Sequence, residues 1–231
     1  MRRFTQVYHR LYEYYGPQGW WPLIKEGRDG LNCRYEPENS TKELNRQERF
    51  EICAGAILTQ NTNWNNAERA LVNLAQSGIL DPDALAVMEP ELIAAHIRSS
   101  GYYNQKAKKL KAFAQFFQGN PPPDRKLFLS QWGLGPETVD DMLLYAYNQP
   151  VFVIDAYTKR LFSRLGLCDA KVTYHELQNK IMSHLEEDIL MYKEYHALIA
   201  RNAKEHCRKK PECRGCPLEN ICMHARLTGE T

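Results

Sequence analysis

A cluster of cysteines near the C-terminus constrains this chain most. Four of its seven cysteines lie within sixteen residues, at Cys207, Cys213, Cys216 and Cys222. Four thiolates in one short loop can surround one metal centre, and the close middle pair supplies two ligands from a single turn. Pro211, Gly215 and Pro217 keep this segment out of a helix. The spacing indicates a metal site rather than four unliganded thiols, with tetrahedral zinc, the commoner case, or a 4Fe–4S cluster as occupant.

The rest of the sequence is typical of a folded cytosolic protein. The 231 residues are 43% hydrophobic with a net charge of +2, and neither value indicates disorder. No apolar run is long enough to span a membrane, and the N-terminus lacks the apolar region of a signal peptide. We therefore expect a cytoplasmic, nucleoid-associated location. Cys33, Cys53 and Cys168 are isolated, and no disulfide framework is expected.

Hydrophobic periodicity predicts an all-α fold of about ten helices joined by short loops. No run of alternating residues is long enough to indicate a strand, and residues 26–46 have the composition of an exposed connection. The expected helices cover 4–15, 49–58, 63–74, 82–88, 91–97, 104–117, 126–132, 136–147, 156–165, 173–185 and 192–206.

A glycine turn separates two of these helices. In the segment Gly133-Leu134-Gly135-Pro136-Glu137-Thr138, two glycines flank one apolar residue. Glycines permit a tight turn and let a phosphate approach the backbone, and the following helix offers free N–H groups. This arrangement suits a DNA backbone, although ordinary helix hairpins also use it.

Twenty residues beyond the glycine turn, the apolar run 151–154 delivers one carboxylate, Asp155, to the start of a helix. In isolation such an aspartate is most often an N-cap, which accepts hydrogen bonds from the first turn of the helix. Its place after a possible phosphate-binding turn also makes Asp155 a candidate catalytic group.

Together, the hairpin, the Asp-containing helix start and the four-cysteine loop resemble the helix-hairpin-helix DNA glycosylases with iron–sulfur clusters, such as endonuclease III. The likeness covers roughly residues 48–222, and it favours a 4Fe–4S cluster over zinc. One departure is that the family usually has six residues between the first two cysteines, whereas this chain has five. The resemblance implies a helical domain at 48–150, with the hairpin at about 126–147. A discontinuous domain of 1–30 and 151–231 would hold the cluster, with a catalytic cleft between the two domains.

The resemblance also implies residue roles in binding double-stranded DNA that contains a damaged base. Gly55 to Thr62 is similar to the family segment whose glutamine, here Gln60, enters the gap left by a flipped base. Gly101 to Ala107 looks like the wedge loop, with Tyr102 at its tip. Alternatively, Gln60 satisfies a helix end and Tyr102 is a surface aromatic. The expected DNA backbone contacts are Gly133, Gly135, Thr138 and Lys159.

Glu137 stands where bifunctional members of the family have the lysine that attacks the sugar. A carboxylate cannot form an imine, so we expect a monofunctional glycosylase that leaves an intact abasic site. Asp155 would then carry the chemistry, since an ionised carboxylate stabilises the positive charge that develops on the sugar.

An aromatic segment near the N-terminus bears on the substrate. Trp20, Trp21 and Pro22 resemble the residues that line the base pocket of bacterial N3-methyladenine glycosylases, and Phe50 is a weaker pocket candidate. Indole faces attract a cationic alkylated base. The two tryptophans could equally be core residues.

Three groups of basic residues are candidates for DNA contact or for solvated helix faces. They are Lys106, Lys108, Lys109 and Lys111; then Lys159, Arg160 and Arg164; then Arg201, Lys204, Arg208, Lys209 and Lys210. Three other functions stay open: an endonuclease III-like or mismatch glycosylase, a non-catalytic DNA-binding protein, and a zinc-binding regulatory module. A monomer is expected.

Overall fold

The computed structural model describes residues 2–229, which form two compact units. The split unit combines Met1–Trp20 with Pro150–Thr231, and the central unit is Trp21–Gln149. Among the described residues the fold is mostly helical, which confirms the expected class. None of the described helices is both long and apolar enough to cross a membrane.

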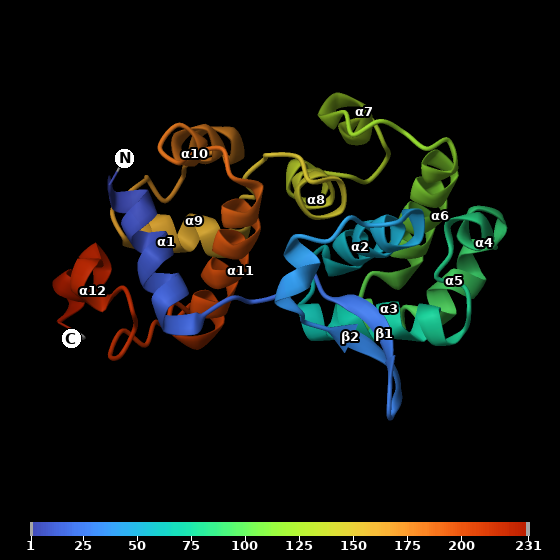
Figure 1. The fold of residues 1–231 in the computed structure, drawn as a ribbon, viewed down its shortest axis with the longest axis horizontal. Coiled ribbons are helices and arrows are strands. Elements are labelled where there is room, and N and C mark those ends of the chain that lie inside the picture. The colour runs from blue at the N-terminus through green and yellow to red at the C-terminus, as the bar shows by residue number, and fades with distance from the viewer. Residues whose placement is uncertain (1, 230–231) are drawn as a thin grey trace. The chain divides into compact units, whose positions relative to one another are not determined.

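The split unit is built around the long helix α11. Tyr195 of α11 donates a hydrogen bond to the carbonyl oxygen of Phe4 at 2.8 Å. The Phe4 ring lies 5.1 Å from that of Phe162, so α1 and α9 join the same core. The unit contains α1 (Arg2–Tyr15), α9 (Ala156–Arg164), α10 (Tyr174–Met182), α11 (Ile189–Glu205) and α12 (Met223–Thr228). Figure 1 shows α1 running alongside α11.

The central unit packs its helices around α2 and α6. Phe50 of α2 is fully buried, and its ring stacks with Phe113 and contacts Phe117, both on α6. Phe128 of α7 closes this aromatic core against Phe113. The helices are α2 (Arg46–Thr59), α3 (Trp64–Gln76), α4 (Pro82–Val87), α5 (Pro90–His96), α6 (Tyr103–Gln118), α7 (Arg125–Leu129) and α8 (Pro136–Asp141), which continues as a π-helical turn, Met142–Ala146.

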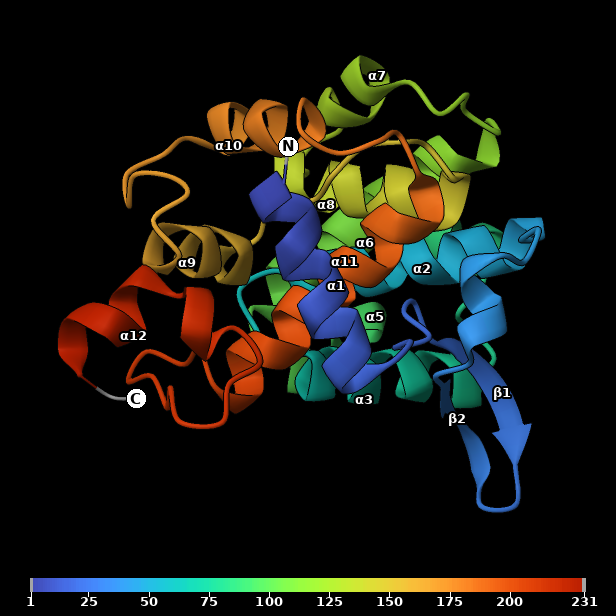
Figure 2. The ribbon, with the colours of Figure 1, turned by 60° about the vertical axis from the view of Figure 1, so that its left-hand side comes forward.

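A β-hairpin lies where the sequence indicated an exposed connection. Strands β1 (Leu23–Gly27) and β2 (Gly30–Arg34) pair antiparallel, and Figure 2 shows them as a projecting ribbon. Glu51 of α2 accepts a hydrogen bond from the Ile24 N–H at 2.6 Å and so fixes β1 to the helix. The expectation of an irregular connection was wrong because five-residue strands with mixed burial carry no clear alternation.

Only some of the helices begin at a residue whose side chain caps the first turn. Asn63 accepts a hydrogen bond from the Asn66 N–H, as its position predicts. The helix expected to start at Asn104 already begins at Tyr103 as α6, so Asn104 lies inside it and does not cap it. Its N-cap is Tyr102, which has a left-handed backbone with φ of 46° and makes no capping hydrogen bond. The start of α6 is therefore stabilised by other contacts.

Candidate functional site

An extended segment brings Asp155 to the start of α9. Phe152, Val153 and Ile154 are almost fully buried, which explains the apolar run. Two side chains from α10 hold this backbone. Gln178 donates to the Phe152 carbonyl oxygen at 2.8 Å, and the Ile154 N–H donates to the Tyr174 hydroxyl at 3.4 Å. The position of Asp155 is thus fixed by core packing.

The two carboxylate oxygens of Asp155 have different partners. Oδ1 accepts hydrogen bonds from the Thr158 N–H and the Thr158 hydroxyl, both at 2.7 Å. Oδ2 lies 3.7 Å from Nε2 of His196, and 16% of the Asp155 side chain is exposed. Burial alone would raise the pKa of Asp155, but His196 and Thr158 outweigh it and hold the pKa below its ordinary value. Asp155 is therefore an N-cap and an ionised carboxylate with one oxygen free of capping.

Sequence reasoning missed His196. It lies on α11, far along the chain from Asp155, and α11 packs against α9. No local motif marks it, because a lone histidine in an apolar helix is most often a core residue.

The four cysteines border one cavity after α11. Its volume is about 20 Å³ and it is partly open to solvent. A backbone hydrogen bond from the Cys216 N–H to the Cys213 carbonyl oxygen, at 3.0 Å, closes the turn of the middle pair. Within residues 2–229, no three His, Cys, Asp or Glu side chains converge closely enough to hold one metal ion. The cysteines thus border a common cavity without converging on a single ion.

Arginines of α9 attach the cysteine loop to the helix that begins at Asp155. Arg160 donates to the Cys207 carbonyl oxygen at 2.6 Å. Arg164 contacts the Cys207 sulfur at 3.2 Å and the carbonyl oxygens of Arg208 and Lys209 at 2.6 and 3.0 Å. These two guanidinium groups are committed to the loop, which corrects their expected role as possible DNA contacts.

Two polar atoms beside the cavity fit a bound inorganic group. Asn202 Nδ2 and His224 Nε2 are buried, and neither finds a hydrogen-bond partner among the described residues. Both residues line the cavity with the cysteines. Buried polar groups of folded proteins are nearly always satisfied. A cysteine-bound group in this space would place acceptor atoms near both.

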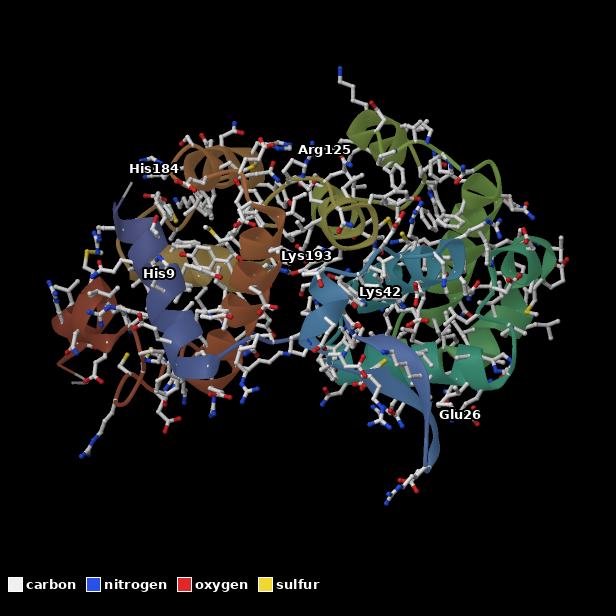
Figure 3. All side chains as sticks on the ribbon, viewed as in Figure 1. His9, Glu26, Lys42, Arg125, His184 and Lys193 are labelled. Carbon is white, nitrogen blue, oxygen red and sulfur yellow. The ribbon has the colours of Figure 1, made fainter. Side chains whose placement is uncertain are left out.

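The glycine turn joins α7 to α8. Gly133 has φ of +83°, a conformation that side chains rarely adopt, whereas Gly135 has an ordinary φ of −100°. A Cβ added at Gly135 would meet no atom within 4 Å, so packing does not require glycine there. Arg125 of α7, labelled in Figure 3, makes a two-point ion pair with Asp140 of α8, at 2.6 and 3.0 Å. The Arg125–Asp140 ion pair thus joins the two helices on either side of the turn, and the space next to Gly135 is open.

Gln60 is bound to this turn. It is the C-cap of α2, and its Nε2 donates to the Gly133 carbonyl oxygen at 3.1 Å and to the Thr138 hydroxyl at 2.9 Å. Its Oε1 accepts from Lys109 at 2.6 Å. Thr138 is 7% exposed, and in this structure its hydroxyl accepts from Gln60, so its expected contact with a phosphate stays a prediction. Glu137 is exposed.

Tyr102 projects from a constrained turn. Its side chain is 71% exposed, and the preceding Gly101 also has a positive φ of 66°. Below it, Lys106 is 2% exposed and donates to the carbonyl oxygens of Leu58 and Ser100 at 2.8 and 2.6 Å. Lys106 is therefore an internal tie between the end of α2 and the Tyr102 turn, and not the DNA contact that its cluster suggested.

Most of the expected base-pocket residues lie in the core. Trp21 is 4% exposed and packs edge-on against Trp64, and a Cβ at Gly55 would come within 3.1 Å of its indole. Pro22 is buried, and Phe50 is enclosed by the aromatic core of the central unit. These placements correct the expectation that Trp21, Pro22 and Phe50 are open to a base. Trp20 is half-buried.

Further residues of the three basic groups form ion pairs with glutamates. Lys111 lies 3.9 Å from Glu89, Arg208 lies 3.8 Å from Glu212, and Arg201 pairs with Glu205. Lys159 is half-buried at the start of α9. The lysines that are exposed in these groups are Lys108, Lys204, Lys209 and Lys210.

Comparison with known proteins agrees with this geometry. Residues 54–187 match the model of the HhH-GPD superfamily of base excision DNA repair proteins, and this match spans the hairpin and Asp155. The chain belongs to this family. It is thus a DNA glycosylase of the base excision repair family. A protein of Methanocaldococcus jannaschii, whose name DNA repair glycosylase MJ1434 is provisional, is 38% identical over 94% of each chain.

Other relatives extend the comparison. Endonuclease III of Bacillus subtilis is 26% identical over 80% of this chain and 85% of its own. A solved complex of endonuclease III with DNA has the same fold, with a TM-score of 0.77 and 17% identity over both full chains. The 3-methyladenine DNA glycosylase of H. pylori, bound to 1,N6-ethenoadenine, has a TM-score of 0.60 and 26% identity. That match covers 72% of this chain and 92% of the other.

Proposed function

We propose that this protein is a monofunctional glycosylase that removes an alkylated purine, such as N3-methyladenine, from double-stranded DNA. It would act as a monomer and leave an intact abasic site. The observation that carries the proposal is Asp155, a carboxylate fixed by core packing and kept ionised by His196 and Thr158. A fixed negative charge is what cleavage of an N-glycosidic bond requires, because the sugar becomes cationic as the base leaves.

The two carboxylate oxygens of Asp155 would have different roles. Oδ1 is occupied by two hydrogen bonds from Thr158, which fix the orientation of the carboxylate. Oδ2 is the oxygen left to face the sugar and to orient the attacking water. His196 then acts as a positioning residue that keeps the charge on Asp155. An alkylated purine is already a good leaving group, so this single carboxylate suffices.

Glu137 supports the absence of strand cleavage. It occupies the position of the family lysine, it is exposed, and its carboxylate cannot attack the sugar to form an imine. Lysines do lie nearby in the central unit. Lys106, however, is buried in an internal role, and Lys109 is engaged by Gln60.

The likeness to the H. pylori 3-methyladenine glycosylase supports an alkylated purine as substrate. Fewer aromatic side chains line the base pocket than the sequence suggested, because Trp21 and Phe50 belong to the core. Trp20 is the residue of that set which we retain as a stacking partner. Gln60 and Tyr102 remain the proposed wedge residues, and Gly133, Gly135 and Lys159 the proposed backbone contacts.

We also propose that Cys207, Cys213, Cys216 and Cys222 hold a 4Fe–4S cluster. A single zinc ion would draw its four sulfurs to within roughly 4 Å of one another. The cysteines instead border one cavity without converging on one ion among the described residues. Bound there, the cluster would supply a rigid cross-link. The loop would then present Lys209 and Lys210 to a DNA backbone.

Excision from a panel of duplexes tests the function. The panel holds methylated DNA, oxidised pyrimidines, uracil, and mismatched adenine and thymine. We expect release of N3-methyladenine without strand breaks and no adduct on borohydride treatment. Activity only on oxidised pyrimidines, or a trapped adduct, would show that the chain acts like endonuclease III instead. We also expect the purified protein to be brown, and metal analysis to find iron rather than zinc.

A further inference from the structure

Gln60, the residue proposed to enter the gap in DNA, is fully engaged elsewhere in this structure. Both of its amide groups are in use, with Nε2 bonded to Gly133 and Thr138 and Oε1 bonded to Lys109. Each such hydrogen bond stabilises the docked side chain, and the one to the charged ammonium does so most. Entry into DNA therefore requires Gln60 to leave a specific docked position.

Lys109 makes the strongest of these contacts and also touches the hairpin. Its ammonium lies 2.6 Å from Gln60 Oε1. Its methylene stem lies against Gly133, where an added Cβ would come within 2.7 Å of the Lys109 Cε. One side chain thus contacts both the proposed wedge residue and the proposed phosphate-binding turn.

The charge of Lys109 has no carboxylate partner among residues 2–229. Its side chain is half-buried, and burial lowers the pKa of its ammonium below the ordinary value. Lys106, one helical turn earlier, is also held only by carbonyl oxygens, those of Leu58 and Ser100. An uncompensated lysine next to the hairpin, as Lys109 is, would attract a phosphate more strongly than it attracts a neutral amide.

We propose that Lys109 is a latch that a DNA phosphate releases. In the free protein its ammonium holds Gln60 against the hairpin. When a backbone phosphate binds at Gly133 and Gly135, the ammonium transfers to the phosphate, and the Gln60 side chain is freed to enter the DNA. This proposal rests on the proposed DNA-binding role of the hairpin.

The variant Lys109→Met tests the latch because it keeps the stem against Gly133 and removes the charge. The matched control is Lys111→Met on the same helix, whose ammonium faces Glu89. Binding to an undamaged duplex is measured across salt concentrations. The slope of log affinity against log salt should fall by about 0.9 in Lys109→Met, the value for one phosphate contact, and stay unchanged in the control. Lys109→Arg should restore the slope.

Single-turnover excision from methylated DNA at saturating enzyme gives the second readout. Lys109→Met should excise faster than wild type, since Gln60 starts unlatched, whereas Gln60→Ala should be about tenfold slower. An unchanged salt slope, or excision no faster than wild type in Lys109→Met, would overturn the latch. A thermal unfolding curve identifies a variant that fails to fold. If Lys109→Met fails to fold, Lys109→Arg is measured instead, and its excision rate should equal that of wild type.

The two proposals fail separately. If the wild-type protein releases no base from any duplex, the proposed function is wrong, and the salt slopes still report the phosphate contact of Lys109. If the wild type excises bases and Lys109→Met keeps the full slope, only the latch is wrong.

Discussion

Asp155 in the split unit and Glu51 in the central unit are both carboxylates with little exposure to solvent. Asp155 accepts two hydrogen bonds from Thr158 and faces His196, and its pKa is held below the ordinary value. Glu51 accepts one hydrogen bond from Ile24, and burial raises its pKa to about 7. Similar burial thus gives opposite pKa shifts, and the partners make the difference. A protein that needs a charged carboxylate has to surround it with donors, as at Asp155.

The substitution Asp155→Asn should have the largest effect. Asparagine caps a helix as well as aspartate does, so α9 should stay intact while the negative charge is lost. We expect single-turnover excision to fall by about 10²- to 10³-fold with unchanged DNA affinity. Thermal unfolding at neutral pH should show a modest loss of stability, because a carboxylate whose pKa is lowered by folding stabilises the folded state when it is charged. If the variant keeps wild-type excision, Asp155 is only a cap and the comparison with Glu51 loses its functional meaning.

The substitution Glu51→Gln tests the other carboxylate through stability. Because the pKa of Glu51 is raised in the folded state, wild type binds an extra proton on folding at mildly acidic pH. The stability it contributes is present below about pH 4.5 and is lost as pH rises through 7. Glutamine keeps the acceptor for the Ile24 N–H without a charge. The variant should be more stable than wild type at pH 8 by about 1–3 kcal/mol, with little difference at pH 5. Urea unfolding at both values measures this, and parallel pH profiles would contradict it.

These two residues also mark how far the sequence could predict the site. Asp155 and the four cysteines have local signatures, a helix start and a loop spacing, and in the structure Asp155 caps α9 and the cysteines border one cavity. The charge of Asp155 depends on His196, which comes from another helix and has no signature. In the sequence, Glu51 is a polar residue of a predicted helix with no special mark. It becomes a buried hydrogen-bond acceptor only because β1, which the sequence did not predict, donates to it.

The aromatic residues show the same limit. Periodicity marks Trp21 and Phe50 as large apolar side chains but cannot distinguish the lining of a pocket from the filling of a core. Gly55 decides the matter for Trp21, because the missing side chain there leaves room for the indole. The all-α class was predictable because long helices dominate the chain, whereas the short β-hairpin was not.

The substitution His196→Phe should have a moderate effect that sharpens the comparison. It removes the group that keeps Asp155 charged while the burial of the carboxylate remains. The pKa of Asp155 then rises, so the acid limb of the excision profile should move to higher pH. The rate at pH 8 should fall less than about tenfold, since Asp155 is still ionised there. An acid limb at the wild-type position would mean that Thr158 alone sets the charge.

The substitution Thr158→Val should have the smallest effect and separates the two partners of Asp155. Valine has nearly the same shape and keeps the backbone N–H that donates to Oδ1, but it lacks the hydroxyl that donates at 2.7 Å. Thr158 is fully buried, so no solvent replaces the lost donor. We expect excision to slow by about threefold at neutral pH, with a smaller rise of the acid limb than in His196→Phe. An effect larger than that of His196→Phe would show that the hydrogen bonds to Oδ1, rather than the histidine facing Oδ2, shift the pKa of this carboxylate in the direction opposite to that of Glu51.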